Sequence, residues 1–317
     1  MNTPRLIGQT APIDRAMTRA ELIAGLTATH ASVAPKYFYD ALGSRLFAAI
    51  TELPEYYPTR TEAAIFRDHL SDIARFTGAS STLVDLGAGN CEKAARLFAA
   101  LAVRRYVAVD ISADFLYASL ERLQYEHPEM EMLGVGLDFS RELHLPAELG
   151  ADPKTLFYPG SSIGNLTPDM ALDFLRQVND ACEGGSLIIG VDLVKDRAVL
   201  ESAYDDALGV TAAFNRNLLR HLNRLLETDF EITDWRHVAF FNVVESRIEM
   251  HLEAERDHLV RWPGGERRFR AGERIHTENS YKWLPEAFAD LLRQAGFREP
   301  RSWCDTRGWF AVFTADA

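Results

Sequence analysis

A glycine turn that follows a short apolar stretch is the first feature of the 317-residue chain with chemical meaning. Leu83-Val84-Asp85-Leu86 runs directly into Gly87-Ala88-Gly89. Glycines in such a turn let the backbone approach a ligand without interference from Cβ atoms. A dinucleotide-binding fingerprint needs a third glycine three residues after the second, and Glu92 holds that position here. The D-x-G-x-G form is typical of S-adenosylmethionine sites, so the pattern favours that cofactor over NAD.

Carboxylates follow the next two apolar stretches. Asp110 comes 23 positions after Gly87, where a carboxylate suits the two hydroxyls of a ribose. Asp138 and Phe139 end the following stretch and offer an acceptor for an adenine amino group beside an aromatic ring for its face. Glycines and aspartates also make ordinary turns after strands. Three such ends in the right order favour the cofactor site over that simpler interpretation.

A second glycine turn spans Gly160 to Asn165. In an open α/β sheet, polar groups at the carboxyl edge lie where a substrate binds. This turn therefore predicts a substrate site, although Asn165 taken alone fits an ordinary turn residue equally well.

The elements that must position these residues alternate between strand and helix patterns. Short apolar runs of the kind found in buried parallel strands occur at Leu83–Leu86, Tyr106–Asp110, Met132–Phe139, Thr155–Tyr158 and Leu187–Leu193. They predict an α/β fold with a doubly wound, Rossmann-like sheet from about Ser81 to Leu193. A helix at Pro285–Phe297 and strands at Arg301–Cys304 and Trp309–Thr314 would complete the sheet as in class I methyltransferases.

A second lobe is predicted from the segment between the fifth strand and the last helix, which is too long for a plain connection. Ala198–Leu226 has a helical pattern, and Val238–Arg256 and Leu259–Trp262 have strand patterns. We expect residues 60–195 plus 284–317 to form the cofactor-binding domain. Residues 1–59 plus 196–283 would form an inserted α+β substrate-binding lobe.

Composition excludes several classes of function. The net charge is −12, from 34 Lys plus Arg against 46 Asp plus Glu, and this argues against a nucleic-acid partner. The three cysteines are far apart and the nine histidines form no H-E-x-x-H pattern, so we expect no metal. No stretch approaches the roughly 18 apolar residues of a membrane span, and residues 1–14 lack the apolar core of a signal peptide. We therefore expect a cytoplasmic protein with no membrane contact.

Longer and less regular segments carry a family resemblance. They are KYFYDALGS (36–44), LPEYYPTRTE (53–62), GSSIGNLTP (160–168), DLVKD (192–196), YDDALGVTAAFNRN (204–217) and RIEM (247–250). The chain resembles the histidine-specific Nα-methyltransferases of ergothioneine biosynthesis over nearly its whole length, least in the first thirty residues and in 256–274. The resemblance implies a two-lobed enzyme that converts histidine to its trimethylated betaine, hercynine, in three transfers from S-adenosylmethionine.

The resemblance also implies roles for single residues. The cofactor positions are Gly87, Lys93, Asp110, Asp138 and Phe139. The contacts to the backbone part of the amino acid are Tyr56, Asn165 and Tyr204, and the residues near the reacting amine are Tyr39 and Gly160, so that Tyr39 and Asn165 would be catalytic. The residues around the imidazole are Glu278, Ser280 and, in the wall beside the ring, Met250.

The local sequence agrees with the imidazole pair. In an extended segment, Glu278 and Ser280 point the same way, and a carboxylate and a hydroxyl suit the two imidazole nitrogens. Asn279, Tyr281 and Trp283 depart from the family pattern around this pair. A methyltransferase for a tryptophan- or tyrosine-type amino acid therefore stays open as an alternative, as does a cofactor-binding module without turnover. We expect a monomer.

Overall fold

The computed structural model describes residues 2–7, 15–78, 81–111, 113–139 and 142–317, without the side chains of 113–115. The chain divides into two compact units. Unit 1 comprises residues 1–10, 58–194 and 282–317, and unit 2 comprises 11–57 and 195–281. The prediction about a signal peptide concerns residues 1–14, of which 1 and 8–14 lie outside the described residues.

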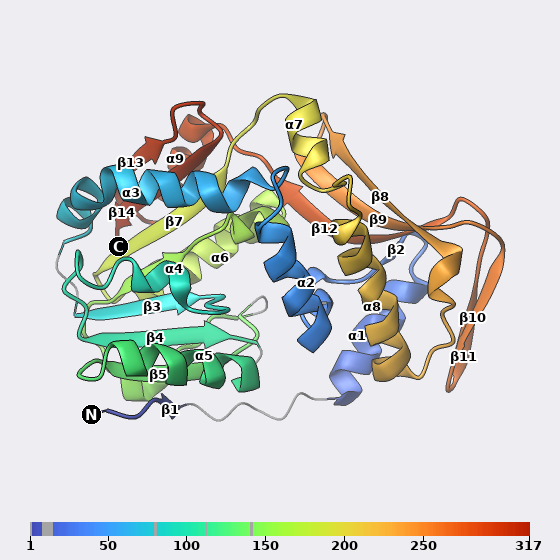
Figure 1. The fold of residues 1–317 in the computed structure, drawn as a ribbon, viewed down its shortest axis with the longest axis horizontal. Helices are drawn as coiled ribbons and strands as arrows, with labels where there is room; N and C mark the ends of the chain where they lie inside the picture. Colours follow the sequence, from blue (N-terminus) through green and yellow to red (C-terminus); the bar gives the residue numbers. More distant parts are fainter. Residues whose placement is uncertain (1, 8–14, 79–80, 112, 140–141) are drawn as a thin grey trace. The chain divides into compact units, whose positions relative to one another are not determined.

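Unit 1 contains one eight-stranded sheet (Figure 1). In spatial order its strands are β1 (Arg5–Leu6), β5 (Glu131–Gly136), β4 (Arg105–Asp110), β3 (Thr82–Leu86), β6 (Thr155–Tyr158), β7 (Ser186–Asp192), β14 (Phe310–Asp316) and β13 (Arg298–Cys304). The strands from β1 to β7 are parallel, and β14 and β13 close the sheet as an antiparallel pair. The predicted doubly wound methyltransferase sheet is confirmed.

Helices cover both faces of this sheet and bury its apolar side chains in two clusters. One cluster packs against α3 (Tyr57–Thr77), the four-residue α4 (Glu92–Ala95) and α5 (Ala113–Glu126). The other packs against α6 (Pro168–Ala181) and α9 (Pro285–Gln294). Successive residues of one strand point to opposite faces, so Leu83 packs in the first cluster and Val84 in the second. Burial on both faces explains why these strands appear in the sequence as continuous apolar runs.

Strand β1 corrects the predicted lobe assignment at the N-terminus. Arg5 and Leu6 pair in parallel with Leu133 and Gly134 of β5, so they belong to unit 1 rather than to the substrate lobe. A two-residue strand at the edge of a sheet buries too little apolar surface to produce a recognisable sequence pattern.

Unit 2 combines helices with a four-stranded sheet in the order β2 (Ala31–Ser32), β12 (Arg274–Tyr281), β9 (Arg247–Ala254) and β8 (Trp235–Asn242). A separate hairpin consists of β10 (His258–Trp262) and β11 (Gly265–Phe269). The helices are α1 (Arg15–Thr27), the 3₁₀ turn η1 (Pro35–Phe38), α2 (Ala41–Thr51), α7 (Arg197–Ser202) and α8 (Val210–Leu226).

The helical stretch predicted over Ala198–Leu226 is two helices, α7 and α8, rather than one. Gly209 has a φ of +75° immediately before α8, and Asp206 accepts hydrogen bonds from the backbone N–H groups of Val210 and Thr211. A left-handed glycine and a capping carboxylate start a new helix here.

A β-bulge in β12 decides which side chains share a face of the unit 2 sheet. His276 pairs with His251, but Glu278 pairs with Met250, so the register shifts between His276 and Glu278. Because successive residues of a strand point to opposite faces, the shift places Glu278 on the face of Met250 and away from His276. The hydroxyl of Thr277 donates to the carbonyl of Met250 at 3.0 Å and holds the bulge.

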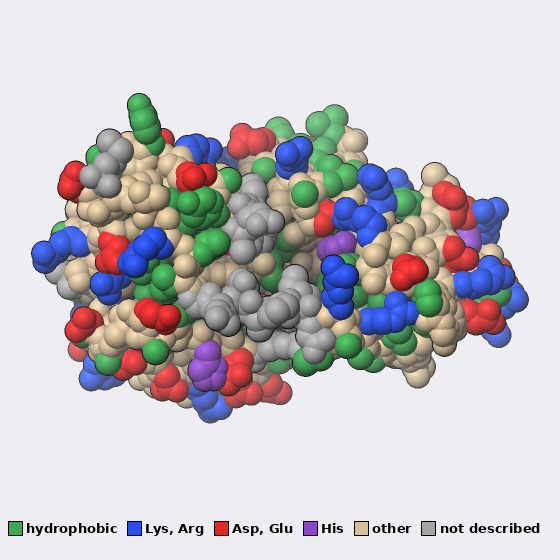
Figure 2. Space-filling view, turned by 90° about the horizontal axis from the view of Figure 1, so that it is seen from below, with side chains coloured by type: hydrophobic (Ala, Val, Ile, Leu, Met, Phe, Trp, Pro, Cys, Tyr) green, Lys and Arg blue, Asp and Glu red, His purple; other side chains and the backbone are tan. Residues whose placement is uncertain are grey.

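The described residues include no helix long and apolar enough to cross a membrane. On the face drawn in Figure 2, acidic and basic side chains are interspersed rather than gathered by sign.

Candidate active site

The glycine turn after β3 has the geometry that the sequence predicts. Gly87 and Gly89 have φ angles of +74° and +52°, which residues with a Cβ atom rarely adopt. Gly87 donates its N–H to the carbonyl of Val109 at 2.8 Å, and Gly89 donates to Oδ2 of Asp110 at 3.0 Å. The structure thus brings the turn and the carboxylate at the end of β4 together.

Phe139 lies beside the same turn, within ordinary van der Waals range of Gly87. A Cβ atom added to Gly87 would stand 3.8 Å from the Phe139 ring. That ring packs near Tyr158 and Phe174, at centroid distances of 6.0 Å from each. Asp138 and Phe139 follow β5. The predicted cofactor residues after β3, β4 and β5 therefore lie at the same edge of the sheet, because these neighbouring strands are parallel.

Asp85 lies in β3, two residues before Gly87, and has an unusual environment. Its side chain is buried, and Oδ2 accepts a hydrogen bond of 2.7 Å from the hydroxyl of Tyr106. Burial raises the pKa of Asp85 to about 7, because desolvation penalises the charged carboxylate more than the Tyr106 hydroxyl favours it. Burial also raises the pKa of the neighbouring Cys91 to about 12, so this thiol stays protonated and unreactive.

Lys93 and Gly160 are joined by Glu62, a residue that the sequence analysis missed. Oε2 of Glu62 accepts from Nζ of Lys93 and Oε1 accepts from the N–H of Gly160, each at 2.7 Å. Glu62 is 1% exposed, and a Cβ atom on Gly190 would come within 2.1 Å of its Oε1. A signal was present, because the carboxylate stands one helical turn before Ile65 and Phe66 on the apolar face of α3.

The second glycine turn is held at both ends. Gly160 has a φ of +75°, and the Ser161 hydroxyl accepts a 2.8 Å hydrogen bond from the N–H of Asp192. The 3₁₀ turn η3 (Ser162–Asn165) follows and ends at Asn165. Thr167 then caps α6 by accepting from the N–H of Met170. Asn165 is therefore fixed between the turn and the start of α6, while its side-chain role stays a prediction.

In unit 2, the predicted amino-acid contacts lie along a row of aromatic rings. The centroids of Tyr39 and Phe47 are 5.7 Å apart, those of Phe47 and Tyr56 are 6.2 Å apart, and those of Tyr56 and Tyr204 are 6.3 Å apart. The row ends at a 2.7 Å hydrogen bond between the hydroxyls of Tyr204 and Ser280. Phe47, to which the sequence assigns no role in the site, lies between Tyr39 and Tyr56 and contacts both rings.

Tyr204 is positioned through its backbone by a buried histidine. Nε2 of His237 lies 2.8 Å from the carbonyl of Tyr204, and Nδ1 lies 2.8 Å from Nδ2 of Asn215. Because the Asn215 amide donates, Nδ1 must accept and Nε2 must carry the proton. Burial lowers the pKa of His237, which agrees with this neutral form.

The residues predicted to bind the imidazole lie on one face of the unit 2 sheet. Glu278 pairs with Met250 and Ser280 pairs with Ile248, so both point the same way, as the sequence predicts. Met250 and Ser280 are buried. The bulge before Glu278 places its side chain on this face, and the Tyr204 hydroxyl forms a hydrogen bond with Ser280 there.

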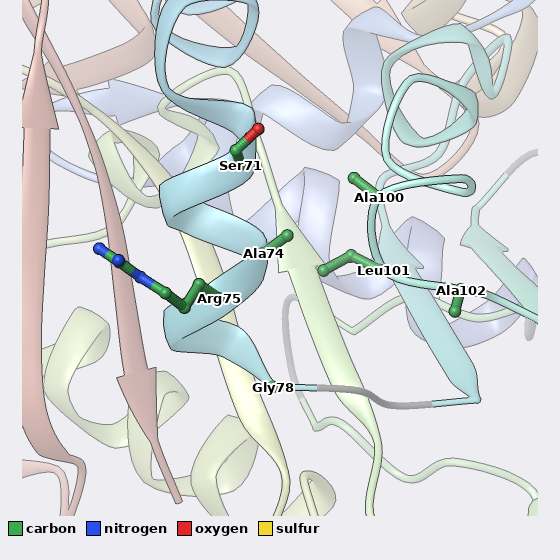
Figure 3. A pocket seen from close by; sticks show the side chains of 7 residues that line it. All are labelled: Ser71, Ala74, Arg75, Gly78, Ala100, Leu101 and Ala102. Atoms are coloured by element: carbon green, nitrogen blue, oxygen red, sulfur yellow. The ribbon is translucent and has the colours of Figure 1, made fainter.

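A surface pocket of about 460 Å³ in unit 1 lies away from these groups (Figure 3). Ala74 of α3 and Leu101 point toward one another across it, whereas Arg75 points away. Arg75 pairs with Asp72 and stacks on Phe76. None of the predicted site residues lines this pocket, so it adds nothing to the candidate site.

Known proteins resemble this chain over most of its length. A family model described as histidine-specific methyltransferase, SAM-dependent, matches residues 18–317. The histidine N-alpha-methyltransferase of Mycolicibacterium smegmatis is 43% identical, with 94% of each chain covered, and its counterpart in Mycobacterium tuberculosis is also 43% identical with the same coverage. Ergothioneine biosynthesis protein 1 of Neurospora crassa is 32% identical over 84% of this chain and 31% of that protein.

Proposed function

The chain belongs to the histidine-specific, S-adenosylmethionine-dependent methyltransferases, and on this premise we propose that it transfers three methyl groups to the α-amino nitrogen of L-histidine, giving hercynine for ergothioneine biosynthesis. Within the structure, the observation that supports histidine most directly is the placement of Glu278 and Ser280 on one face of β12. A carboxylate and a hydroxyl on one face suit the two nitrogens of an imidazole.

The proposed cofactor residues are Gly87, Lys93, Asp110, Asp138 and Phe139. Asp110 is the proposed acceptor for the ribose hydroxyls, since its carboxylate lies at the glycine turn and accepts a hydrogen bond from the N–H of Gly89. Asp138 is proposed to accept a hydrogen bond from the adenine amino group, and Phe139 is proposed to pack on the face of the adenine ring. When bound, S-adenosylmethionine supplies an electrophilic methyl group whose departing sulfur needs no proton.

The proposed substrate residues act through charge, hydrogen bonds and aromatic faces. Asn165, Tyr56 and Tyr204 are assigned to the amino acid's carboxylate and amine. Tyr39 and Gly160 are assigned to the neighbourhood of the reacting nitrogen, where an aromatic face favours the cationic product. Met250 forms the apolar wall beside the imidazole. The hydroxyls of Tyr204 and Ser280 form a hydrogen bond. It connects Tyr204, the proposed contact to the amino acid's backbone part, with Ser280, the proposed contact to its imidazole ring.

The transfer itself is an in-line displacement, and the chain's task is to align the neutral amine. We assign no covalent intermediate and no metal to this step. The amine reaches its neutral form by losing a proton to water, since none of the proposed site residues has the properties of a dedicated base. A histidine side chain presents two polar nitrogens to Glu278 and Ser280, whereas leucine offers them no hydrogen-bonding group.

The function is tested by incubating the purified chain with each of the twenty amino acids and isotopically labelled S-adenosylmethionine, followed by mass spectrometry. Histidine should gain one, two and then three methyl groups. Methylation of tryptophan or tyrosine instead would support the aromatic amino-acid alternative. Cofactor binding in calorimetry with no S-adenosylhomocysteine released would support the non-catalytic module. Neither alternative is favoured by the family to which the chain belongs.

A cytoplasmic location, a monomeric state and the lack of a nucleic-acid partner remain parts of this proposal. The expectation about nucleic acid rests on the net charge of −12.

A further inference from the structure

The unit 2 sheet carries a second group of polar side chains on the face opposite Glu278. Glu249 and His251 are two apart on β9, so they point to the same face, and His276 of β12 pairs directly with His251. Glu278 pairs with Met250 and therefore points the other way. The same β-bulge that places Glu278 among the proposed substrate residues thus leaves His276 with Glu249 and His251.

The three side chains converge closely. One potential ligand atom from each lies within 4.8 Å of the other two. Nε2 of His251 is 3.0 Å from Oε2 of Glu249, and the rings of His251 and His276 are 5.1 Å apart at their centroids. The side chains of Glu249 and His251 are only 10% and 12% exposed. Two imidazoles and a carboxylate are therefore gathered in a largely desolvated place.

Two neighbours orient the carboxylate as they would in a metal site. Oε1 of Glu249 accepts from Nδ2 of Asn242 and Nε of Arg247, each at 2.9 Å. These bonds occupy Oε1 and leave Oε2 directed at His251. Ligating carboxylates are commonly held by such outer hydrogen bonds.

The imidazoles are also held in place, and one of them is incompletely paired. Phe240 stacks on His251 with an angle of 3° between the rings. Among the described residues, Nδ1 of His251 is buried without a hydrogen-bond partner. Nε2 of His251 is the nitrogen that faces Glu249, so Nε2 would be the ligand atom and Nδ1 takes no part in the cluster.

The surrounding charges do not exclude a cation. Arg274 pairs with Glu253 at 2.7 Å, and Arg247 pairs with Glu249 at 2.8 Å and also contacts the hydroxyl of Tyr281. Glu253 also pairs with Arg236, and Arg247 also pairs with Glu245, so three arginines and three glutamates cancel in formal charge. The imidazoles can then serve as neutral ligands.

We propose that Glu249, His251 and His276 bind one divalent cation of the zinc class. Two nitrogens and one oxygen suit Zn²⁺, whereas Ca²⁺ and Mg²⁺ prefer oxygen ligands alone. Ligand bonds of about 2.0 Å place two ligands of a tetrahedral ion about 3.3 Å apart, close to the observed Glu249–His251 separation. The ion would replace the proton that these atoms share. Oδ1 of Asn279, 2.9 Å from Nε2 of His276, and solvent are available for the fourth position.

Such an ion would link β9 to β12 beside the bulge. The residues proposed to bind the imidazole lie on the opposite face of the same two strands. It would bind the folded chain and not the unfolded one, and thereby raise its thermal stability.

The test uses the full chain without an affinity tag, stripped with EDTA and titrated with ZnCl₂ in calorimetry. We expect one equivalent bound, a higher melting temperature, and at least tenfold weaker binding in His251→Ala and His276→Ala. His30→Ala, which removes an exposed histidine of the same unit, should bind like the wild type.

Two further measurements keep the proposal testable if a variant fails to fold. Co²⁺ added to the wild-type chain should give the visible absorption bands of a nitrogen- and oxygen-ligated ion, and Glu249→Gln should abolish them. No stoichiometric zinc binding by the folded wild-type chain would overturn the proposal. Equal loss of binding in His30→Ala and His251→Ala would also overturn it, since surface histidines would then account for the binding.

Discussion

The candidate residues of unit 1 and those of unit 2 are positioned by different means. In unit 1, the glycine turns at 87–89 and 160 expose backbone atoms, and Asp110 and Glu62 accept hydrogen bonds from that backbone. In unit 2, side chains from separate helices and strands form the aromatic row and the pair Glu278 and Ser280. The cofactor residues thus depend on glycine turns and on a few side chains at the strand ends, whereas a choice among amino acids needs particular functional groups from several elements. Variants in the two units should therefore affect different ligands.

The largest effect is expected for the pH dependence of folding in unit 1. The pKa of Asp85 rises from 3.8 to about 7 in the folded chain because burial disfavours the charged carboxylate. The neutral form stabilises the fold fully below pH 3.8, and this stabilisation is lost as the pH rises to about 7. The loss is on the order of 4 kcal/mol. Asp85→Asn should remove this slope, as measured by urea denaturation at pH 5 and pH 8.

His237 in unit 2 supplies the opposite case as a control. Burial lowers its pKa, so its neutral form stabilises the fold above pH 6.5, and this contribution is lost as the pH falls below that value. The two pH ranges overlap, but the slopes have opposite sign. His237→Gln should remove a rise of stability with pH below 6.5, whereas Asp85→Asn should remove a fall of stability between pH 3.8 and about 7. Parallel profiles for wild type and Asp85→Asn would show that the Asp85 pKa is not raised.

The second effect concerns the choice of substrate. Glu278→Ala should weaken histidine binding by roughly 1.5–3 kcal/mol, the scale of a hydrogen bond to a charged group, or about tenfold to 150-fold. Affinity for S-adenosylmethionine, measured by calorimetry, should stay within about twofold of the wild type. Glu266→Ala, which removes an exposed carboxylate of the same unit, should change neither. Unchanged histidine affinity in Glu278→Ala would remove the basis for its assignment.

Glu62 offers the converse test in unit 1. Glu62→Gln keeps an acceptor for the N–H of Gly160 but loses the charge that pairs with Lys93, so cofactor affinity should fall about tenfold, or about 1.4 kcal/mol. Histidine affinity should change little. If Glu62 acts through Lys93, then adding Glu62→Gln to Lys93→Met should cost less than the two separate effects predict. Fully additive effects would show that Glu62 acts otherwise.

The sequence predicts much of unit 1 because its signals are local. A strand buried on both faces must be continuously apolar, and a turn with positive φ requires glycine, so β3 and Gly87 are recognisable without neighbours. Glu62 was missed because its partners, Lys93 and Gly160, lie 31 and 98 residues away along the chain. A buried carboxylate has meaning only through partners that the fold brings to it.

The sequence predicts less of unit 2, where the signals are distributed. The separate roles of Tyr204 and Ser280 followed from the family resemblance, and no pattern indicated that their hydroxyls meet. The shared direction of Glu278 and Ser280 follows from strand alternation alone. The cluster of Glu249, His251 and His276 does not, because it depends on strand pairing and on the bulge after His276. The sequence-based expectation of no metal considered spacing along the chain, which does not reveal ligands on neighbouring strands.

The smallest expected effect tests whether the hydroxyl pair in unit 2 acts on substrate or only on the fold. Tyr204→Phe removes the hydrogen bond to Ser280 and should raise the KM for histidine about twofold to tenfold, the range of a single neutral hydrogen bond of about 0.5–1.5 kcal/mol. Tyr281→Phe is the matched control, because the Tyr281 hydroxyl contacts Arg247 and its side chain points to the opposite face of the sheet. A purely structural role for the Tyr204 hydroxyl would lower thermal stability and leave the KM for histidine unchanged. A rise in KM in Tyr204→Phe alone, absent in Tyr281→Phe, would instead assign recognition to the face that carries Glu278 and Ser280.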